Sequence, residues 1–298
     1  MIRPGYRRGR CRGEPVYAGP SQYKGTAVSL AWTDVTFAYA IYLAAIAWAV
    51  PRFAVARLTA TLALAILLGL WLWWPSSGDG TLIAAAVRWV VVPSLALLVT
   101  YRASGAFFVR PSPPLERWLL AIDDALLWRT GILRVFGAGS TLVRDVFELF
   151  YLLVYAVVPA GAVVLLASGR HDALGLYWTT LFVAELTCYA ALPWLQSRPP
   201  RAVEAEAASG TSARNLNLWL LRYGSIQCNT FPSAHAAGAV AIGLAVSSAF
   251  PSAGVVFMVV AVGITMATVL GRYHYLLDSV LGVVVATISW AVLEVLGS

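Results

Sequence analysis

Apolar runs long enough to cross a lipid bilayer recur along this chain and limit how it can fold. A bilayer has a hydrocarbon core about 30 Å thick, which a helix of about 20 apolar residues spans. Backbone groups in lipid must be hydrogen-bonded internally, and the chain has no pattern of alternating barrel strands. We therefore predict an all-α, polytopic membrane helix bundle with about eight spans, at residues 31–50, 56–74, 82–101, 146–167, 174–195, 234–250, 253–270 and 275–296.

The composition agrees with this prediction and excludes several classes of protein. Hydrophobic residues make up 60% of the 298 residues and charged residues 12%, against about 25% charged residues in a soluble domain. A disordered chain, a soluble enzyme with one core and an ordinary nucleic-acid-binding domain are therefore excluded. The formal net charge of +7 is typical of basic flanks that set topology and contact anionic lipids, so we expect a membrane and no nucleic acid as the partner.

The chain divides into three parts. Residues 1–26 form a basic tail, residues 27–143 hold the first spans and an amphipathic segment, and residues 144–298 hold the remaining spans. In the amphipathic segment, residues 115–128, apolar and charged side chains segregate at helical spacing. This pattern predicts a helix lying in the membrane interface. Its Asp123-Asp124 pair is interpreted as part of the water-facing side, with a metal site as the less favoured alternative.

Three polar segments fall on one face of the membrane when the spans are counted from a cytoplasmic tail. They are 198–201 (Arg-Pro-Pro-Arg), 231–235 (Phe-Pro-Ser-Ala-His) and 272–278 (Arg-Tyr-His-Tyr-Leu-Leu-Asp). The cations of the tail favour a cytoplasmic N-terminus. We therefore expect these segments at the external face of a bacterial-type plasma membrane. If the whole protein had the opposite orientation, the three segments would still lie on the same face as one another.

His274 and Asp278 are four residues apart at the start of the last predicted span. Residues at this spacing lie on one helix face, so the carboxylate can accept a hydrogen bond from one ring nitrogen. The other nitrogen is then free to attack or to take a proton. The alternative is an acid favoured by the helix dipole beside an interfacial histidine.

Ser233 and His235 open the sixth predicted span. A serine at this position caps a helix, and the free N–H groups of the first turn bind anions. His235 lies within that turn, where it could act as a general acid. The alternative is an ordinary capped span with a surface histidine.

Three arginines, Arg198, Arg201 and Arg272, lie in or beside these segments. Guanidinium groups bind phosphate in bidentate fashion and remain charged. The alternative is a positive juxtamembrane flank, which for Arg201 alone is the favoured interpretation. Together with two histidines, the set suits displacement at phosphorus, with charge spread over the phosphoryl oxygens. We find no carboxylate cluster typical of a two-metal site, so the arginines would take the place of metal ions.

The order Arg-Pro, Pro-Ser-x-His and His-x-x-x-Asp resembles the type 2 phosphatidic acid phosphatase (PAP2) superfamily. The resemblance covers about residues 183–297. It implies a six-helix core, catalytic helices within residues 144–298, and an enzyme that works without a metal or cofactor through a phosphohistidine intermediate.

The resemblance also implies roles for individual residues. His274 resembles the nucleophile and Asp278 its orienting partner. His235 resembles the acid that protonates the leaving group and then the base that activates the acceptor. Arg198 and Ser233 resemble the phosphate ligands of the family.

Three positions that depart from the usual motifs indicate a particular subgroup of the superfamily. Ala191 stands where the first motif has Lys, Thr268 where the third has Arg, and Ala234 where the second most often has Gly. These features, with His-Tyr-x-x-Asp as the third motif, resemble the inositol phosphorylceramide and sphingomyelin synthases. This resemblance implies transfer of phosphate or a phospho-headgroup from a lipid phosphate or phospholipid to a lipid alcohol. A lipid or polyprenyl phosphate phosphatase and a non-catalytic lipid-binding or transport protein remain alternatives.

Glu185 lies in the middle of the predicted span 174–195. An acid inside a membrane is a functional candidate by default. It either pairs with an arginine such as Arg88, lines the substrate route, or is a protonated structural residue.

Overall fold

The computed structural model describes residues 30–74, 81–204 and 211–297, and the basic tail predicted at residues 1–26 lies outside them. Within the described residues the regular structure is helical, which confirms the all-α prediction. The helices are α1 (Trp32–Ala49), η1 (Pro51–Ala56), α2 (Arg57–Trp73), α3 (Leu82–Ala86), η3 (Val87–Val91), α4 (Val92–Gly105), α5 (Pro113–Asp123), η4 (Asp124–Trp128), α6 (Ile132–Ala138), α7 (Thr141–Ala167), α8 (Ala173–Ala191), η5 (Pro200–Ala202), α9 (Ser212–Gly224), α10 (Ala234–Ala249), α11 (Pro251–Leu270) and α12 (Leu276–Gly297).

The described residues contain five helices that are long and apolar enough to cross a membrane. They are Pro51–Trp73, Leu82–Gly105, Thr141–Ala167, Pro251–Leu270 and Leu276–Leu296. They indicate an integral membrane protein.

The structure does not show eight spans, although all eight predicted runs are helical. Helix α10 has only 16 residues, which at 1.5 Å per residue falls short of the hydrocarbon core. Helices α1 and α8 are not among the five, and each carries an acidic residue, Asp34 and Glu185.

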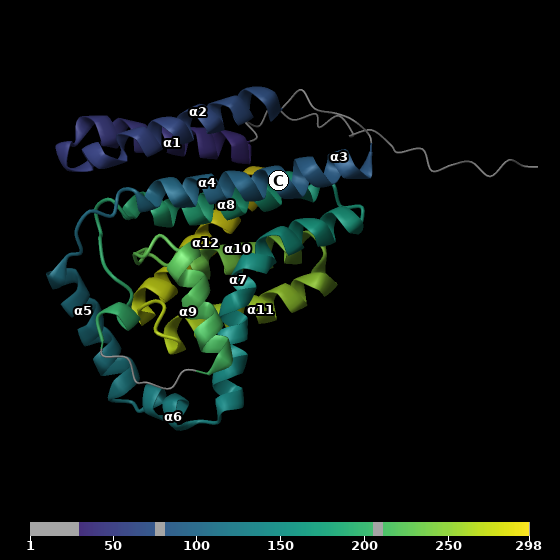
Figure 1. Ribbon diagram of the computed structural model, residues 1–298. Helices are drawn as coiled ribbons and strands as arrows, with labels where there is room; N and C mark the ends of the chain where they lie inside the picture. Colours follow the sequence, from purple (N-terminus) through teal and green to yellow (C-terminus); the bar gives the residue numbers. More distant parts are fainter. Residues whose placement is uncertain (1–29, 75–80, 205–210, 298) are drawn as a thin grey trace, which may run out of the picture.

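The bundle is centred on α8 and α10. Helix α10 packs against α8, α11 and α12, and α7 packs against α10 and α11. Helix α10 is rich in Ala and Gly, and such small side chains let helix backbones approach closely. Helices α1 and α2 lie side by side along one edge, next to α4 and α8 (Figure 1). The α8–α10–α12 contact is what brings the second and third polar segments together.

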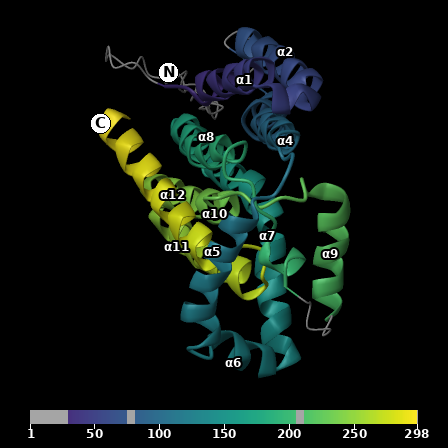
Figure 2. The same cartoon turned by 90° about the vertical axis from the view of Figure 1, so that its left-hand side faces the viewer.

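Helix α9 packs against α7, and α5 packs against α12. Helix α6 lies at the end of the molecule away from α1 and α2 (Figure 2). The helix predicted over residues 115–128 is present as α5 continued by η4, with Trp118 and Trp128 partly exposed. The interpretation of Asp123 was wrong: its side chain is 1% exposed and contacts Arg272. The position of Asp123 on the polar face of the helix predicted exposure to water. In the fold, the Arg272 guanidinium pairs with its carboxylate, so Asp123 is buried.

Glycine at position 282 allows α12 to pack directly on the start of α10. A Cβ added there would overlap the backbone carbonyl oxygen of Ser233 and also press on Ala236. A backbone atom at a helix N-terminus cannot move aside as a flexible side chain can. The fit of α12 against the second polar segment therefore depends on the absence of a side chain at this position.

We expect Gly282→Ala to destabilise the protein, because overpacking of a close helix contact costs about 1–3 kcal/mol. The measurement is thermal unfolding in detergent. Gly175→Ala is the matched control, since an added Cβ at Gly175 meets nothing within 4 Å. Equal melting temperatures for the two variants would contradict the close contact.

Candidate active site

Backbone hydrogen bonds join the three polar segments pairwise at one end of the bundle. The N–H of Arg201 donates to the carbonyl of Arg272 at 3.1 Å, and the N–H of Ser233 donates to the carbonyl of Asp278 at 2.8 Å. The N–H of Asn229 donates to the carbonyl of Ser197 at 2.9 Å, beside the first and second segments. The predicted convergence of the segments is therefore present in the fold.

Ser233 forms the N-cap of α10, as its sequence position indicates. Its Oγ accepts a hydrogen bond from the N–H of Ala236 at 3.3 Å, and its side chain is fully buried. The cap places His235 in the first turn of α10. Ser233 itself does not line the cavity that contains His235.

The turn before α12 sets the direction of His274. The carbonyl of Thr268, at the end of α11, accepts the N–H groups of both Tyr273 and His274. Arg272 adopts a left-handed backbone with φ of 57°, a conformation unusual for a residue with a side chain. This turn directs the Arg272 side chain to Asp123 and Glu204 and the His274 side chain to Asp278 and His235.

His274 lies between Asp278 and His235. Its Nδ1 is 3.1 Å from Oδ2 of Asp278, and its Nε2 is 3.4 Å from Nδ1 of His235. An ionised Asp278 accepts the Nδ1 proton, which leaves the Nε2 lone pair of His274 for attack; we infer this tautomer from the hydrogen bonds. The spacing-based prediction of a His274–Asp278 pair agrees with this geometry, and the fold adds His235 to it.

The environment of His274 keeps its ring neutral. Its side chain is almost completely buried, and burial, followed by the positive charge of Arg201, lowers the pKa of His274. These two effects oppose that of the Asp278 carboxylate, 3.1 Å from Nδ1, which favours the protonated ring. A neutral imidazole has a free lone pair, whereas an imidazolium has none. The site therefore favours a nucleophilic form of His274 at neutral pH.

An aromatic stack supports the two histidines. The Tyr151 ring, on α7, lies parallel to the Tyr273 ring at 3.7 Å between centroids and parallel to the His235 ring at 5.6 Å. This stack fixes the plane of His235. Sequence reasoning missed Tyr151, because it lies far from the motifs in an apolar helix and only packing brings it to them.

The three arginines have different surroundings. Arg198 forms a bidentate pair with Glu116 of α5, at 2.9 and 3.0 Å, and its side chain is 44% exposed. Arg272 is mostly buried and binds Glu204 and Asp123. Arg201 forms no ion pair with any described residue and lines the cavity of the two histidines. The structure thus brings Arg201, not Arg198 or Arg272, to the histidine pair.

Glu148 of α7 is a second residue that sequence reasoning missed. Its carboxylate accepts hydrogen bonds from Arg214 and Asn217 of α9 and from the Tyr273 hydroxyl. It therefore ties α7, α9 and the turn before α12 together. The signal available in the sequence was an acid near the start of an apolar helix, which by itself does not indicate its partners.

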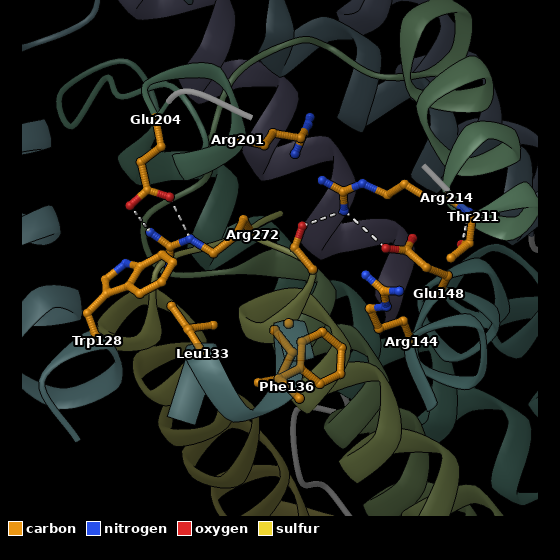
Figure 3. A pocket seen from close by; sticks show the side chains of 13 residues that line it. Trp128, Leu133, Phe136, Arg144, Glu148, Arg201, Glu204, Thr211, Arg214 and Arg272 are labelled. Carbon is orange, nitrogen blue, oxygen red and sulfur yellow. Dashed lines mark hydrogen bonds and ion pairs between the residues drawn. The ribbon is translucent and has the colours of Figure 1, made fainter. Parts of the chain in front are cut away.

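Two cavities share Arg201 as a lining residue. The cavity at the histidines has a volume of about 20 Å³, close to the space of one water molecule. The second has a volume of about 360 Å³ and is lined by Arg144, Arg214 and Arg272 as well as Arg201 (Figure 3). Arg201 is the one described residue that lines both cavities.

Comparison with known proteins gives one family. The PAP2 superfamily matches over residues 117–292, more than half of the chain. The chain belongs to the PAP2 superfamily. No curated protein and no solved structure gives a significant match. Membership implies a membrane enzyme of the phosphatase or phosphotransferase type, acting on phosphoesters without a metal ion, and it does not resolve the subgroup.

Glu185, predicted within a span, lies beside this site in α8. It accepts a hydrogen bond from the Tyr189 hydroxyl at 2.6 Å and packs against Gly238 of α10. The Tyr189 ring lines the histidine cavity. Glu185 thus supports the wall of that cavity, while Arg88 lies over the Trp74 and Trp89 rings.

The lowered pKa of His274 predicts activity that persists in mild acid. A histidine with a pKa of about 6.5 would be about 90% protonated at pH 5.5, and protonation removes the nucleophile. We expect the kcat/KM for a phosphodiester lipid, which does not itself titrate in this range, to lose less than half its value between about pH 7.5 and 5.5. An acid limb centred near pH 6.5 would mean that His274 is solvated; thermal stability at each pH controls for unfolding.

Proposed function

We propose that this chain is an integral-membrane phosphotransferase that acts on a lipid phosphoester through a phosphohistidine intermediate. The observation that carries the proposal is the arrangement Asp278–His274–His235, in which one ring nitrogen of His274 is held and the other faces a second histidine. Membership of the PAP2 superfamily supports a phosphoester as substrate. The N-terminus is proposed to be cytoplasmic and the site external, in a bacterial-type plasma membrane.

In the first step, Nε2 of His274 attacks phosphorus and a P–N bond forms. The P–O bond to the leaving alcohol breaks, and its oxygen takes the electron pair and a proton from His235. His235 enters this step as an imidazolium, because the bound phosphate anion offsets the burial and the neighbouring positive charge that lower its pKa. In the second step, an acceptor hydroxyl attacks phosphorus, its proton passes to His235, and the P–N bond breaks. Asp278 stabilises the positive charge that develops on the His274 ring, as a carboxylate does for a catalytic imidazole.

Arg201 is proposed as the main ligand of the phosphoryl oxygens. Preorganised donors aimed at developing charge supply much of the catalysis of phosphoryl transfer. Arg198 and Arg272 each already contact carboxylates. Arg198 could bind phosphate only if its guanidinium also contacted Glu116 or released it. The Ser233 hydroxyl could bind phosphate only while it also accepts the hydrogen bond from the N–H of Ala236.

Burial of the site limits the access of bulk water to His274. His274 is 4% exposed, and the cavity beside it holds about one water. A site that excludes bulk water protects a phosphorylated intermediate from hydrolysis. The His-Tyr-x-x-Asp form of the third motif favours a lipid alcohol as the acceptor, and a PAP2-type lipid phosphatase, with water as acceptor, is the alternative that the same chemistry allows.

We expect purified protein to form a new phospholipid only when ceramide or diacylglycerol is added to a panel of phospholipids and polyprenyl phosphates. Products and free phosphate are followed by mass spectrometry. His274→Ala should abolish turnover and acid-labile ³²P labelling of the protein, because no P–N bond can form. His171→Ala, in an exposed turn between α7 and α8, is the matched control. Free phosphate without an acceptor requirement would establish the phosphatase instead, and wild-type turnover by His274→Ala would exclude both.

The assignment of Arg201 has its own test. We expect Arg201→Gln to lower kcat/KM by about 100-fold or more, the usual loss for a donor to developing charge. Arg222→Gln, an exposed arginine of α9, should change it less than about two-fold, as substitutions of exposed residues normally do. If Arg201→Gln lowered kcat/KM as little as the control does, Arg198 would be the better candidate for the phosphate ligand.

A further inference from the structure

The backbone of His235 is held more firmly than its ring. In the first turn of α10, the N–H of Ala234 donates to the Thr230 hydroxyl at 3.1 Å, and Ser233 caps the helix. Among the described residues, the ring of His235 has one hydrogen-bonding contact, Nε2 of His274 at 3.4 Å from its Nδ1, which is long for a hydrogen bond. In the proposed reaction this nitrogen of His274 attacks phosphorus, so it cannot hold His235 while the proton is transferred.

A second contact to the His235 ring comes from Tyr151 of α7. The two ring centroids are 5.6 Å apart and the ring planes differ by 13°, within the usual range of aromatic pairs, about 4.5–7 Å. Tyr151 is 2% exposed, and α7 packs against α10, so the bundle encloses the pair. Stacking uses neither ring nitrogen of His235, and both therefore stay available to carry a proton.

Tyr151 is itself held by a second ring and by a buried acid. The Tyr273 ring lies parallel to it at 3.7 Å between centroids, and the Tyr273 hydroxyl donates to Glu148. Glu148 precedes Tyr151 by three residues, so the two lie on one face of α7. Arg214 and Asn217 of α9 also donate to the Glu148 carboxylate. A continuous set of contacts therefore runs from α9 through Tyr151 to the ring of His235.

The two histidines thus have separate supports. Asp278 lies at 3.1 Å from Nδ1 of His274, whereas Tyr151 stacks on His235. Attack on phosphorus depends on the direction of His274, and protonation of the leaving oxygen depends on the direction of His235. A proton passes between heavy atoms only when they lie within about 2.6–3.2 Å of each other. A His235 ring that was free to turn would therefore slow protonation and leave the attack unchanged.

We propose that Tyr151 is a positioning residue that directs the ring of His235 toward the leaving oxygen. The inference rests on the proposed function and adds a residue to its first step. In that step Nε2 of His274 forms the P–N bond, the P–O bond breaks, and the leaving oxygen takes the electron pair and the proton of His235. Tyr151 gives and takes no proton; it acts through the stack alone.

The kinetic test compares two phosphodiesters that differ only in the leaving group. Didodecyl phosphate releases dodecanol, whose oxygen needs a proton as the P–O bond breaks. Dodecyl para-nitrophenyl phosphate releases para-nitrophenolate, a stable anion that leaves without one. Both place the same dodecyl phosphoryl group on His274, and kcat/KM for release of the leaving group reports this first step. The ratio of the two kcat/KM values therefore measures the contribution of the general acid.

We expect Tyr151→Leu to lower kcat/KM for didodecyl phosphate by about ten-fold or more, part of the 10²–10⁴-fold that a general acid typically contributes. Its kcat/KM for the para-nitrophenyl ester should stay within about two-fold of the wild type. Tyr151→Phe keeps the ring and should restore the wild-type ratio, since the Tyr151 hydroxyl bonds to no described residue. Tyr155→Leu, at a 49% exposed tyrosine one turn further along α7, is the matched control.

An equal loss on both diesters, or no loss on either, would overturn the proposal. Thermal unfolding in detergent accompanies each variant. If Tyr151→Leu does not fold, Tyr151→Met takes its place, because a flexible methionine fills irregular space in a core without supplying a ring.

A spectroscopic measurement separates this proposal from the proposed chemistry. The chain has three histidines, so NMR of ¹⁵N-histidine-labelled protein in detergent follows each ring, with His235→Gln to assign its signals. Tyr151→Leu should shift the ring-proton signals of His235, because the ring current of a stacked tyrosine is lost, and leave those of His171 in place. Unchanged His235 signals would overturn the proposal whether or not a diester is turned over. An equal loss on both diesters for His235→Ala would instead remove His235 as the acid of the proposed function.

Discussion

The ion pair between Asp123 and Arg272 shows the constraint on which the site depends. Charged groups buried at the end of an apolar bundle are stable only when they are paired and hydrogen-bonded. Here Asp123 of α5 binds the Arg272 guanidinium at 2.6 Å and also accepts the N–H of Leu276, at the start of α12. One carboxylate therefore holds both the third motif and the helix that carries Asp278.

The same principle recurs around the site. Glu116 of α5 binds Arg198 through its side chain and backbone N–H, and the Arg198 guanidinium lowers the pKa of that carboxyl. Glu148 binds α9 and the turn before α12. The motifs supply the histidines and arginines of the candidate site, and acids from helices outside the motifs bind the motif arginines and the turn before α12. This explains why the α5 segment, although it carries no motif, lies against the site.

The division among the arginines follows from these pairs. A guanidinium already bound to carboxylates must share or give up a bond to hold phosphate, whereas Arg201 has no such partner among the described residues. Arg201 also lies over the Tyr273 ring, at 5.2 Å from its centroid, so its position is linked to the turn that carries His274. Arg201 also lines both cavities.

The spacing of residues along the chain predicted much of this arrangement. Apolar runs predicted helices, the four-residue interval predicted the His274–Asp278 pair, and the parity of the spans predicted that three segments converge. Each of these features depends on neighbouring residues or on counting segments along the chain, so it can be predicted without knowing how the helices pack. The number of spans was less predictable. Helices such as α8 are apolar because they are largely buried against other helices. Helices that contact protein and helices that contact lipid are both rich in apolar residues, so composition alone does not distinguish them.

By itself the sequence determined the helical class, the membrane setting, the membership of the PAP2 superfamily and the pair of histidines with its aspartate. Only the tertiary structure decided which arginine reaches the histidines, which acids neutralise the others, and where the two cavities lined by Arg201 lie. The physical reason is distance along the chain. Asp123 and Arg272 are 149 residues apart, and Glu148 and Tyr273 are 125 apart. Charges at such separations have no pattern in the sequence, and they become partners only when packing removes water from around both.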